Sequence, residues 1–126
     1  MRNRSTYTPK GWPRVIPRMV AKDHPDQLVR FIKEVFSATG DYQSDRPTVL
    51  TIGDSILMIS EAGLRPATPA FLYIYVPDAD LTYRQALDAG AKSLEQPVDT
   101  PYGDRRAMVE DPWGNVWQIA TAKSES

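Results

Sequence analysis

The sequence contains no cysteine and a single histidine among its 126 residues. It therefore cannot form disulfides, thiolate zinc sites or a cysteine nucleophile, and one histidine cannot build a multi-histidine metal site. The formal net charge of −1 argues against a basic surface for nucleic acid. No apolar run approaches the roughly 20 residues that span a bilayer, and no secretory segment follows Met1. We expect a cytoplasmic single domain that contacts neither nucleic acid nor a membrane.

Residues that commonly carry catalysis or bind nucleotides are also scarce. The seven glycines are scattered singly, so no G-x-G-x-x-G or Walker pattern occurs. His24 lies between Asp23 and Pro25 at a predicted helix start, where we expect a solvated or capping role. A general base would have to be a carboxylate or a tyrosine, and no carboxylate falls at a position predicted to face a binding site. The sequence thus indicates no catalytic residue.

The chain does contain many short elements, which its 11 prolines and its turn residues separate. Proline removes a backbone donor and fixes φ, so it marks the ends of strands and helices. The first half predicts a strand over residues 14–21, an amphipathic helix that opens near Asp23 and stops at Gly40, and a hairpin of strands 48–52 and 55–60 around Gly53.

After a polar link over residues 61–70, the second half repeats this order. It predicts a strand over 71–76, a helix from Asp78 to Gly90, and strands over 92–96, 105–110 and 116–120. Both halves therefore follow a β-α-β-β-β pattern, an α+β arrangement of two modules that must pair to close a core. The predicted organisation is an N-terminal arm (1–13), a single domain (14–121) built from modules 14–60 and 70–121, and a C-terminal tail (122–126).

Three motifs carry a resemblance to a known family: I-G-D-S-I-L-M at 52–58, P-Y-G-D-R-R at 101–106 and D-P-W-G-N-V-W at 111–117. With the duplicated layout, the sequence resembles the vicinal oxygen chelate superfamily of glyoxalase I, bleomycin-resistance proteins and extradiol dioxygenases, in its PhnB-like branch. The resemblance covers residues 14–121 and implies curved mixed sheets around a cup. The stretch 41–47 is shorter than in relatives, so the second strand of module one is expected to be stunted or absent.

The resemblance also shows where metal-dependent relatives hold their metal, on the first and fourth strands of each module. Those positions fall at Ile16, Phe71, Gln118 and either Leu57 or Met58. Apolar side chains and one neutral amide lack the deprotonated oxygen or imidazole donors that a catalytic divalent cation needs. We therefore expect no metal and no other cofactor.

Strand alternation predicts an aromatic wall for the cup. Phe71, Tyr73 and Tyr75 share one face of their strand, and we expect this face to be the concave one. The rings either stack on a flat ligand or fill the cup as core. By the same alternation, Trp117 is expected to pack against a helix.

Four more residues are candidates for ligand binding. Arg18 shares the cup side, where it could stack on a ring, bind a ligand anion, pair with an acid such as Glu110 or point to water. Gln118 could hydrogen-bond either a ligand or a buried tyrosine hydroxyl. Trp113 lies in a turn from which it could reach a ligand or a subunit boundary, and Tyr102 could cover the cup.

The preferred hypothesis is a metal-independent protein that binds a small aromatic or amphipathic molecule, such as an antibiotic or a secondary metabolite, as drug-sequestering members of the family do. One alternative is a metal-independent lyase or isomerase in which Tyr73, Arg18 or Gln118 polarises a small polar substrate. Another is a structural dimer with a filled cup. The resemblance also implies a homodimer, which in some relatives forms by exchange of modules.

Overall fold

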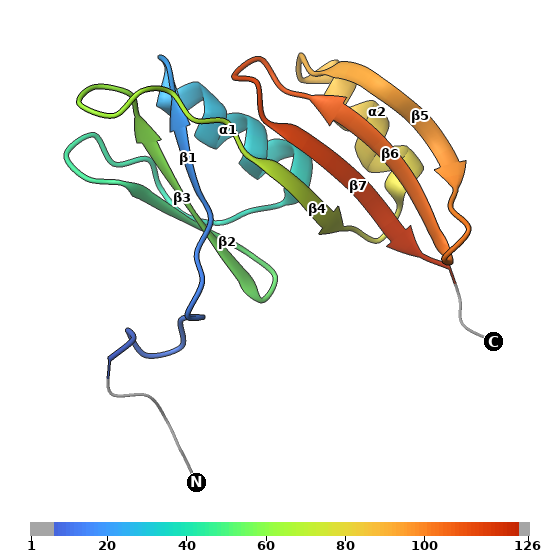
Figure 1. Cartoon of the computed structure of the whole chain (residues 1–126), viewed down its shortest axis with the longest axis horizontal. Coiled ribbons are helices and arrows are strands. Elements are labelled where there is room, and N and C mark those ends of the chain that lie inside the picture. The colour runs from blue at the N-terminus through green and yellow to red at the C-terminus, as the bar shows by residue number, and fades with distance from the viewer. Residues whose placement is uncertain (1–6, 124–126) are drawn as a thin grey trace, which may run out of the picture.

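Two β-sheets and two helices make up residues 7–123, the part of the chain that the computed structural model describes. The helices pack against each other and against the sheets (Figure 1). Within these residues, neither helix is long and apolar enough to cross a membrane. Along the chain the elements are β1 (Arg18–Ala21), α1 (Pro25–Phe36), β2 (Thr48–Ile52), β3 (Ser55–Glu61), β4 (Phe71–Tyr75), α2 (Ala79–Asp88), β5 (Lys92–Asp99), β6 (Asp104–Glu110) and β7 (Val116–Ala122).

Each half of the chain forms its own sheet. Module two has the strand order β4-β7-β6-β5, in which β4 is parallel to β7 and the other pairs are antiparallel. Module one has the order β1-β3-β2, with β1 parallel to β3. The predicted α+β fold is confirmed. Among the described residues, module one lacks the counterpart of β5, and residues 41–47 form a loop there, as their short length indicated.

The amphipathic helix of module one ends earlier than its sequence indicated. Pro25 occupies its first turn, and its apolar stripe is buried. Gly40 was expected to end it, but the helix stops at Phe36, because Ser37 adopts the left-handed conformation at φ 58°. Gly40 instead allows a close approach to β2, because a Cβ there would lie 2.5 Å from the Val49 carbonyl oxygen.

Two strand boundaries differ from their predictions by three residues or more, and proline explains one of them. The first strand begins at Arg18 rather than at residue 14, because Pro17 has no N–H for the ladder, although its carbonyl accepts a bond from Met58. β5 continues past Pro97 to Asp99, since register shifts against β6 accommodate the proline.

A single core lies between the helices and the sheets and joins the two modules. Trp117, which is 1% exposed, stacks on Phe36 of α1 with ring centroids 4.5 Å apart, so its predicted contact with a helix is confirmed. Trp113 of module two lies 6.2 Å from Phe31 of the same helix. Because the modules meet through this helical layer, the opposite face of the module-two sheet stays open.

The D-P-W-G-N turn between β6 and β7 fixes the start of β4. The buried Asp111 carboxylate accepts bonds from the backbone N–H groups of Trp113 and Asn115 and from the Trp117 indole. Asn115 in turn accepts a bond from the Ala70 N–H, at 2.9 Å, directly before β4. This motif therefore has a structural role, and it positions the strand that carries the predicted aromatic wall.

Candidate functional site

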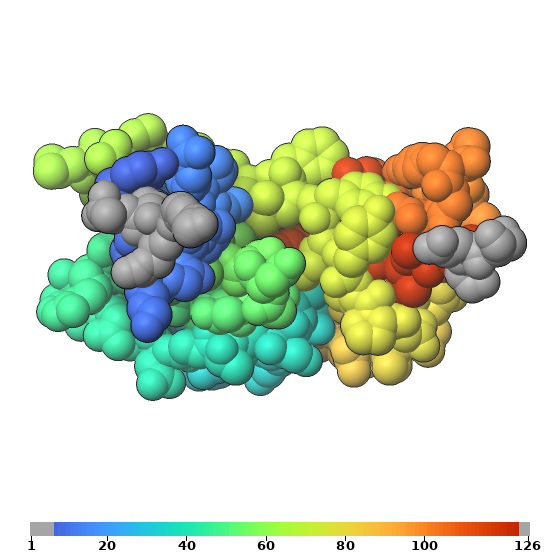
Figure 2. All heavy atoms as spheres, turned by 90° about the horizontal axis from the view of Figure 1, so that it is seen from below, coloured from blue at the N-terminus to red at the C-terminus, as the bar shows by residue number. Residues whose placement is uncertain are grey.

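A cleft with a cavity volume of about 510 Å³ opens between the two modules. Its walls come from three segments: the residues before β1, the hairpin between β2 and β3, and β4, with β7 at its floor. Figure 2 shows this hollow between the green hairpin and the yellow β4 region. The residues that line it are Pro13, Val15, Pro17, Ile52, Gly53, Asp54, Ser55, Ile56, Leu57, Leu72, Tyr73, Ile74, Tyr75 and Trp117.

β4 presents its aromatic residues on the open face, as alternation predicted. Phe71, Tyr73 and Tyr75 are 67%, 39% and 60% exposed, while Leu72 and Ile74 pack against the core. Tyr73 and Tyr75 line the cleft, whereas Phe71 lies on the same face outside it. The wall is therefore accessible surface and not filled core.

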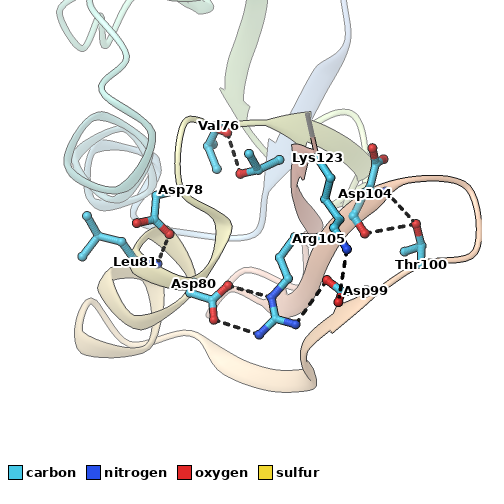
Figure 3. Close-up of polar contacts among 10 residues, drawn as sticks. Val76, Asp78, Asp80, Leu81, Asp99, Thr100, Asp104, Arg105 and Lys123 are labelled. Atoms are coloured by element: carbon cyan, nitrogen blue, oxygen red, sulfur yellow. Dashed lines mark hydrogen bonds and ion pairs between the residues drawn. The ribbon is translucent and has the colours of Figure 1, made fainter. Parts of the chain in front are cut away.

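Asp104 anchors both tyrosines. Its Oδ2 accepts a hydrogen bond from the Tyr73 hydroxyl at 2.5 Å and another from the Tyr75 hydroxyl at 2.9 Å. The side chains reach from β4 across β7 to β6, above Ala120, whose small side chain is fully buried. Thr100 accepts a bond from the Asp104 N–H at 2.9 Å (Figure 3). The two rings are thus held in one arrangement, 5.5 Å apart with their planes at 62°.

The surroundings raise the pKa of both tyrosines. For Tyr73 the larger cause is desolvation and the second is its hydrogen bond to Asp104. For Tyr75 the hydrogen bond to Asp104 comes first. Each hydroxyl therefore keeps its proton, and each proton is already donated to the carboxylate.

Gln118 and Tyr102 lie on the same open face but outside the cleft lining. Gln118 pairs with Tyr73 across the strands and is half-buried, but the Tyr73 hydroxyl donates to Asp104 instead of to this amide. Tyr102, 59% exposed, accepts a bond from Arg106 at 2.8 Å, and Arg106 makes a two-pronged pair with Glu95. Tyr102 therefore binds Arg106, and it also contributes to the raised pKa of Tyr73.

Two predicted site residues lie elsewhere. Arg18 is on the face of the module-one sheet that points away from α1, where its Nε donates to Ser60 at 3.0 Å, and it lines a second, smaller depression of about 230 Å³. The Trp113 indole donates to the Asp23 carbonyl at 3.0 Å and lies near Phe31, so it joins the modules on the helical side. Neither residue lines the cleft.

The register of β1 and β3 shows which of Leu57 and Met58 shares the predicted cup side with Arg18. Met58 does, because it pairs with Arg18, whereas Leu57 is 5% exposed and faces the core and the cleft lining. Phe71 and Gln118 are on the open face of the other sheet, and Ile16 precedes β1 outside any strand. Among residues 7–123, no group of three or more histidine or acidic side chains could hold a metal ion.

Ion pairs near the C-terminal end of β4 involve the opposite face of the module-two sheet. Arg105 binds Asp80 of α2 through two nitrogens, at 3.0 and 3.1 Å, and Asp99 at 3.4 Å (Figure 3). Lys123 also reaches Asp99, at 3.3 Å. The Arg105 guanidinium lowers the pKa of Asp80. This cluster links α2 to the β5–β6 connection. Its charged side chains lie away from the cleft.

Sequence reasoning missed Asp104 and the segment before β1. Asp104 shares its face with Arg106 and Met108 by simple alternation, so the strand over this stretch contained the signal for its orientation. The contribution of Pro13 and Val15 had no comparable signal, because it depends on how the modules pack together.

These features define a two-module α+β protein of glyoxalase-like architecture. The part of the chain that the structure describes has an aromatic-walled cleft and no cluster of metal ligands. The chain belongs to the Glyoxalase/Bleomycin resistance protein/Dioxygenase superfamily, whose sequence model matches residues 17–119.

Curated relatives are longer than this chain. The putative glyoxylase CFP32 of Mycobacterium bovis is 28% identical over 103 residues, which cover 77% of this chain and 40% of that protein. The uncharacterized protein Mb0911c of the same species is 36% identical over 52 residues, 41% of this chain and 34% of the relative. The chain thus spans two fifths or less of the lengths of these relatives.

Solved structures share the fold at low identity. TioX from Micromonospora sp. ML1 superposes with a TM-score of 0.72 at 21% identity, covering 87% of this chain and 98% of that one. A glyoxalase/bleomycin resistance protein/dioxygenase family enzyme from Burkholderia phytofirmans gives 0.73 at 20%, covering 85% and 96%. The fosfomycin resistance protein FosX from Mesorhizobium loti gives 0.63 at 20%, covering 86% and 87%.

Proposed function

We propose that this protein binds a small aromatic or amphipathic molecule non-covalently in the cleft between its modules, without a metal. The observation that carries this proposal is the pair of tyrosines beside the cleft, whose hydroxyls are both anchored on Asp104. Side chains that are already fixed lose little conformational entropy when a ligand arrives, so a preorganised wall favours binding.

The size and lining of the cleft support the same proposal. Its volume of about 510 Å³ is within the range of small-molecule sites, about 300–1,000 Å³. Aliphatic residues and prolines supply most of the lining, and the hairpin around Gly53 adds a few polar groups. FosX, a neighbour in fold, is named for resistance to fosfomycin, which supports a small molecule as the ligand class. Membership of the PhnB-like branch and a cytoplasmic location stay predictions.

The lyase or isomerase hypothesis makes use of the same tyrosine. To polarise a carbonyl or epoxide oxygen, the Tyr73 hydroxyl would have to turn its proton from Asp104 toward the substrate. Turnover of such substrates that withstands a chelator and is lost in Tyr73→Phe would favour this alternative over simple binding. A structural dimer with a filled cup would show neither turnover nor ligand binding.

A thermal-shift screen of planar antibiotics, organic acids and metabolites tests the proposal. A ligand at about 100 times its Kd adds about 2.7 kcal/mol to the free energy of unfolding, so a hit raises the melting temperature measurably. We expect Tyr73→Ala to abolish the shift and Tyr42→Ala, a change of the same size outside the cleft, to preserve it. No hit across the panel, or equal hits with both variants, would contradict binding in the cleft.

A further inference from the structure

The charged side chains that line the cleft or anchor its tyrosines are acidic. Among the residues that line it, Asp54 is the sole acid and none is lysine, arginine or histidine. A second acid, Asp104, lies directly behind the tyrosine hydroxyls and is 7% exposed. The cleft thus has a carboxylate at its hairpin rim and another beneath its aromatic wall.

The tyrosines add acceptors and no donors. A phenol has one proton, and those of Tyr73 and Tyr75 are both donated to the same oxygen of Asp104. Toward the cleft, each side chain can therefore offer oxygen lone pairs and the electron-rich face of its ring. Such a wall is poorly suited to a ligand that presents a carboxylate or a phosphate.

The cations on the same face are already neutralised. Arg106 is paired with Glu95, and Lys92 lies 3.7 Å from Glu110. Arg105 belongs to the other face, where it binds acids, and Arg18 lines the separate depression on module one. Within residues 7–123, no lysine or arginine forms an ion pair with Asp104. Its negative charge is therefore uncompensated next to the aromatic wall.

We propose that the ligand of this cleft is an organic cation, an aromatic or amphipathic molecule that carries a protonated or quaternary amine. This inference rests on the proposed binding function and adds the charge of the ligand to it. The amine would lie over the tyrosine rings, where the π electrons attract it, within the field of Asp104 and opposite Asp54. An anion of the same shape would meet repulsion from both acids and find no free donor on the tyrosines.

Three planar probes of similar shape and different charge test this inference at neutral pH: cationic 9-aminoacridine, neutral acridine and anionic acridine-9-carboxylate. Fluorescence titration of the full chain gives the three dissociation constants. We expect the cation to bind about tenfold more tightly than the neutral probe, as one favourable cation–π contact near a carboxylate implies, and the anion to bind most weakly. Added salt should narrow these differences.

Charge-removing variants identify the source of the preference. Asp104→Asn keeps an oxygen that can accept the tyrosine hydroxyls, and we expect it to lose most of the preference for the cation. Asp54→Asn, on the exposed hairpin, should lose part of it and serves if the first variant folds poorly. Asp99→Asn removes an equal charge from the ion-pair cluster with Arg105 and should leave the preference unchanged.

The outcomes separate this inference from the proposed function. If none of the probes binds, or if Tyr73→Ala leaves their affinities unaltered, binding in the cleft itself is wrong. If the probes bind in a manner that depends on Tyr73 but the neutral or anionic one binds as well as the cation, only the charge assignment is overturned. A preference for the cation that survives both Asp104→Asn and Asp54→Asn would also overturn the charge assignment.

Discussion

Asp111 shows how much a single buried side chain can determine. Its carboxylate is 3% exposed, yet backbone and side-chain N–H groups of Trp113, Asn115 and Trp117 donate to it. Desolvation raises the pKa of Asp111, and these donors oppose that shift. The residue that introduces the family motif is thus a structural acceptor, and its removal would orphan several buried donors.

We expect Asp111→Ala to lower the free energy of unfolding by about 3 kcal/mol, because the buried N–H groups that donate to its carboxylate would lose this acceptor. Asp45→Ala is the control: Asp45 is exposed and pairs with its neighbour Arg46, so its loss should change stability by less than about 0.5 kcal/mol. Urea denaturation followed by circular dichroism gives both values. Equal effects would contradict the structural role of Asp111.

Tyr73 should ionise later than an ordinary tyrosine. Its folded-state pKa is raised above the unfolded value of about 10, so the native state holds this proton more tightly. The resulting stabilisation is present below pH 10 and is lost as pH rises further. In a titration followed by tyrosinate absorbance, Tyr73→Phe should remove amplitude from the latest phase. Loss of amplitude near pH 10 would show that Tyr73 is not held by Asp104.

At the residue scale, alternation was enough to predict which face holds the tyrosines and which holds Trp117. It could not predict that Asp104 anchors Tyr73 and Tyr75, because that contact crosses β7 and depends on the register of three strands. The orientation of Trp113 could not be predicted for a related reason. A turn residue has no alternation to orient it, and its indole donates to the Asp23 carbonyl of the other module.

Among the helices and strands, the boundaries that differ most from their predictions are those that glycine and proline had indicated. Gly40 has the typical signal of a helix end, but the left-handed residue is Ser37, a conformation that non-glycine residues adopt rarely. Pro97 indicated the end of a strand, yet β5 continues through irregular pairing with β6. Local signals predicted that the elements exist, while tertiary contacts decided where they end.

Gly40→Ala should lower the free energy of unfolding by about 2–3 kcal/mol, since φ is 130° there and the new Cβ would approach the Val49 carbonyl oxygen. Gly63 has no positive φ and open space around it, so Gly63→Ala should be neutral within about 0.5 kcal/mol. Thermal and urea denaturation of both variants measure the difference. A tolerated Gly40→Ala would mean that the loop after α1 shifts freely.

At the scale of the whole molecule, the duplicated pattern and the short stretch 41–47 predicted two modules with unequal strand numbers. The position of the cleft was beyond prediction, because it depends on how α1 packs against Trp113 and Trp117 and so sets the distance between the hairpin and β4. The predicted site residues accordingly divide among the cleft, the open face around it, the helical side and the module-one sheet, where Arg18 lies.

The open face of the module-two sheet leads us to propose a homodimer, whether or not modules are exchanged. Phe71 and Val98 are exposed apolar side chains on this face outside the cleft, which a second copy could cover. Light scattering coupled to size exclusion should give twice the chain mass, and Phe71→Glu combined with Val98→Glu should give the monomer. Leu64→Glu, at an exposed site in the link between modules, is the control and should leave the dimer intact. A monomeric wild type would contradict the proposal.

An NMR titration of ¹⁵N-labelled protein with 9-aminoacridine tests directly whether the cleft between the modules is a small-molecule site. If the probe binds there, shifts concentrate in the hairpin around Gly53, in β4 from Leu72 to Tyr75 and at the Trp117 indole, and they vanish in Tyr73→Ala. Shifts confined to the helices or to the depression near Arg18, or none at saturating probe, would contradict binding in the cleft.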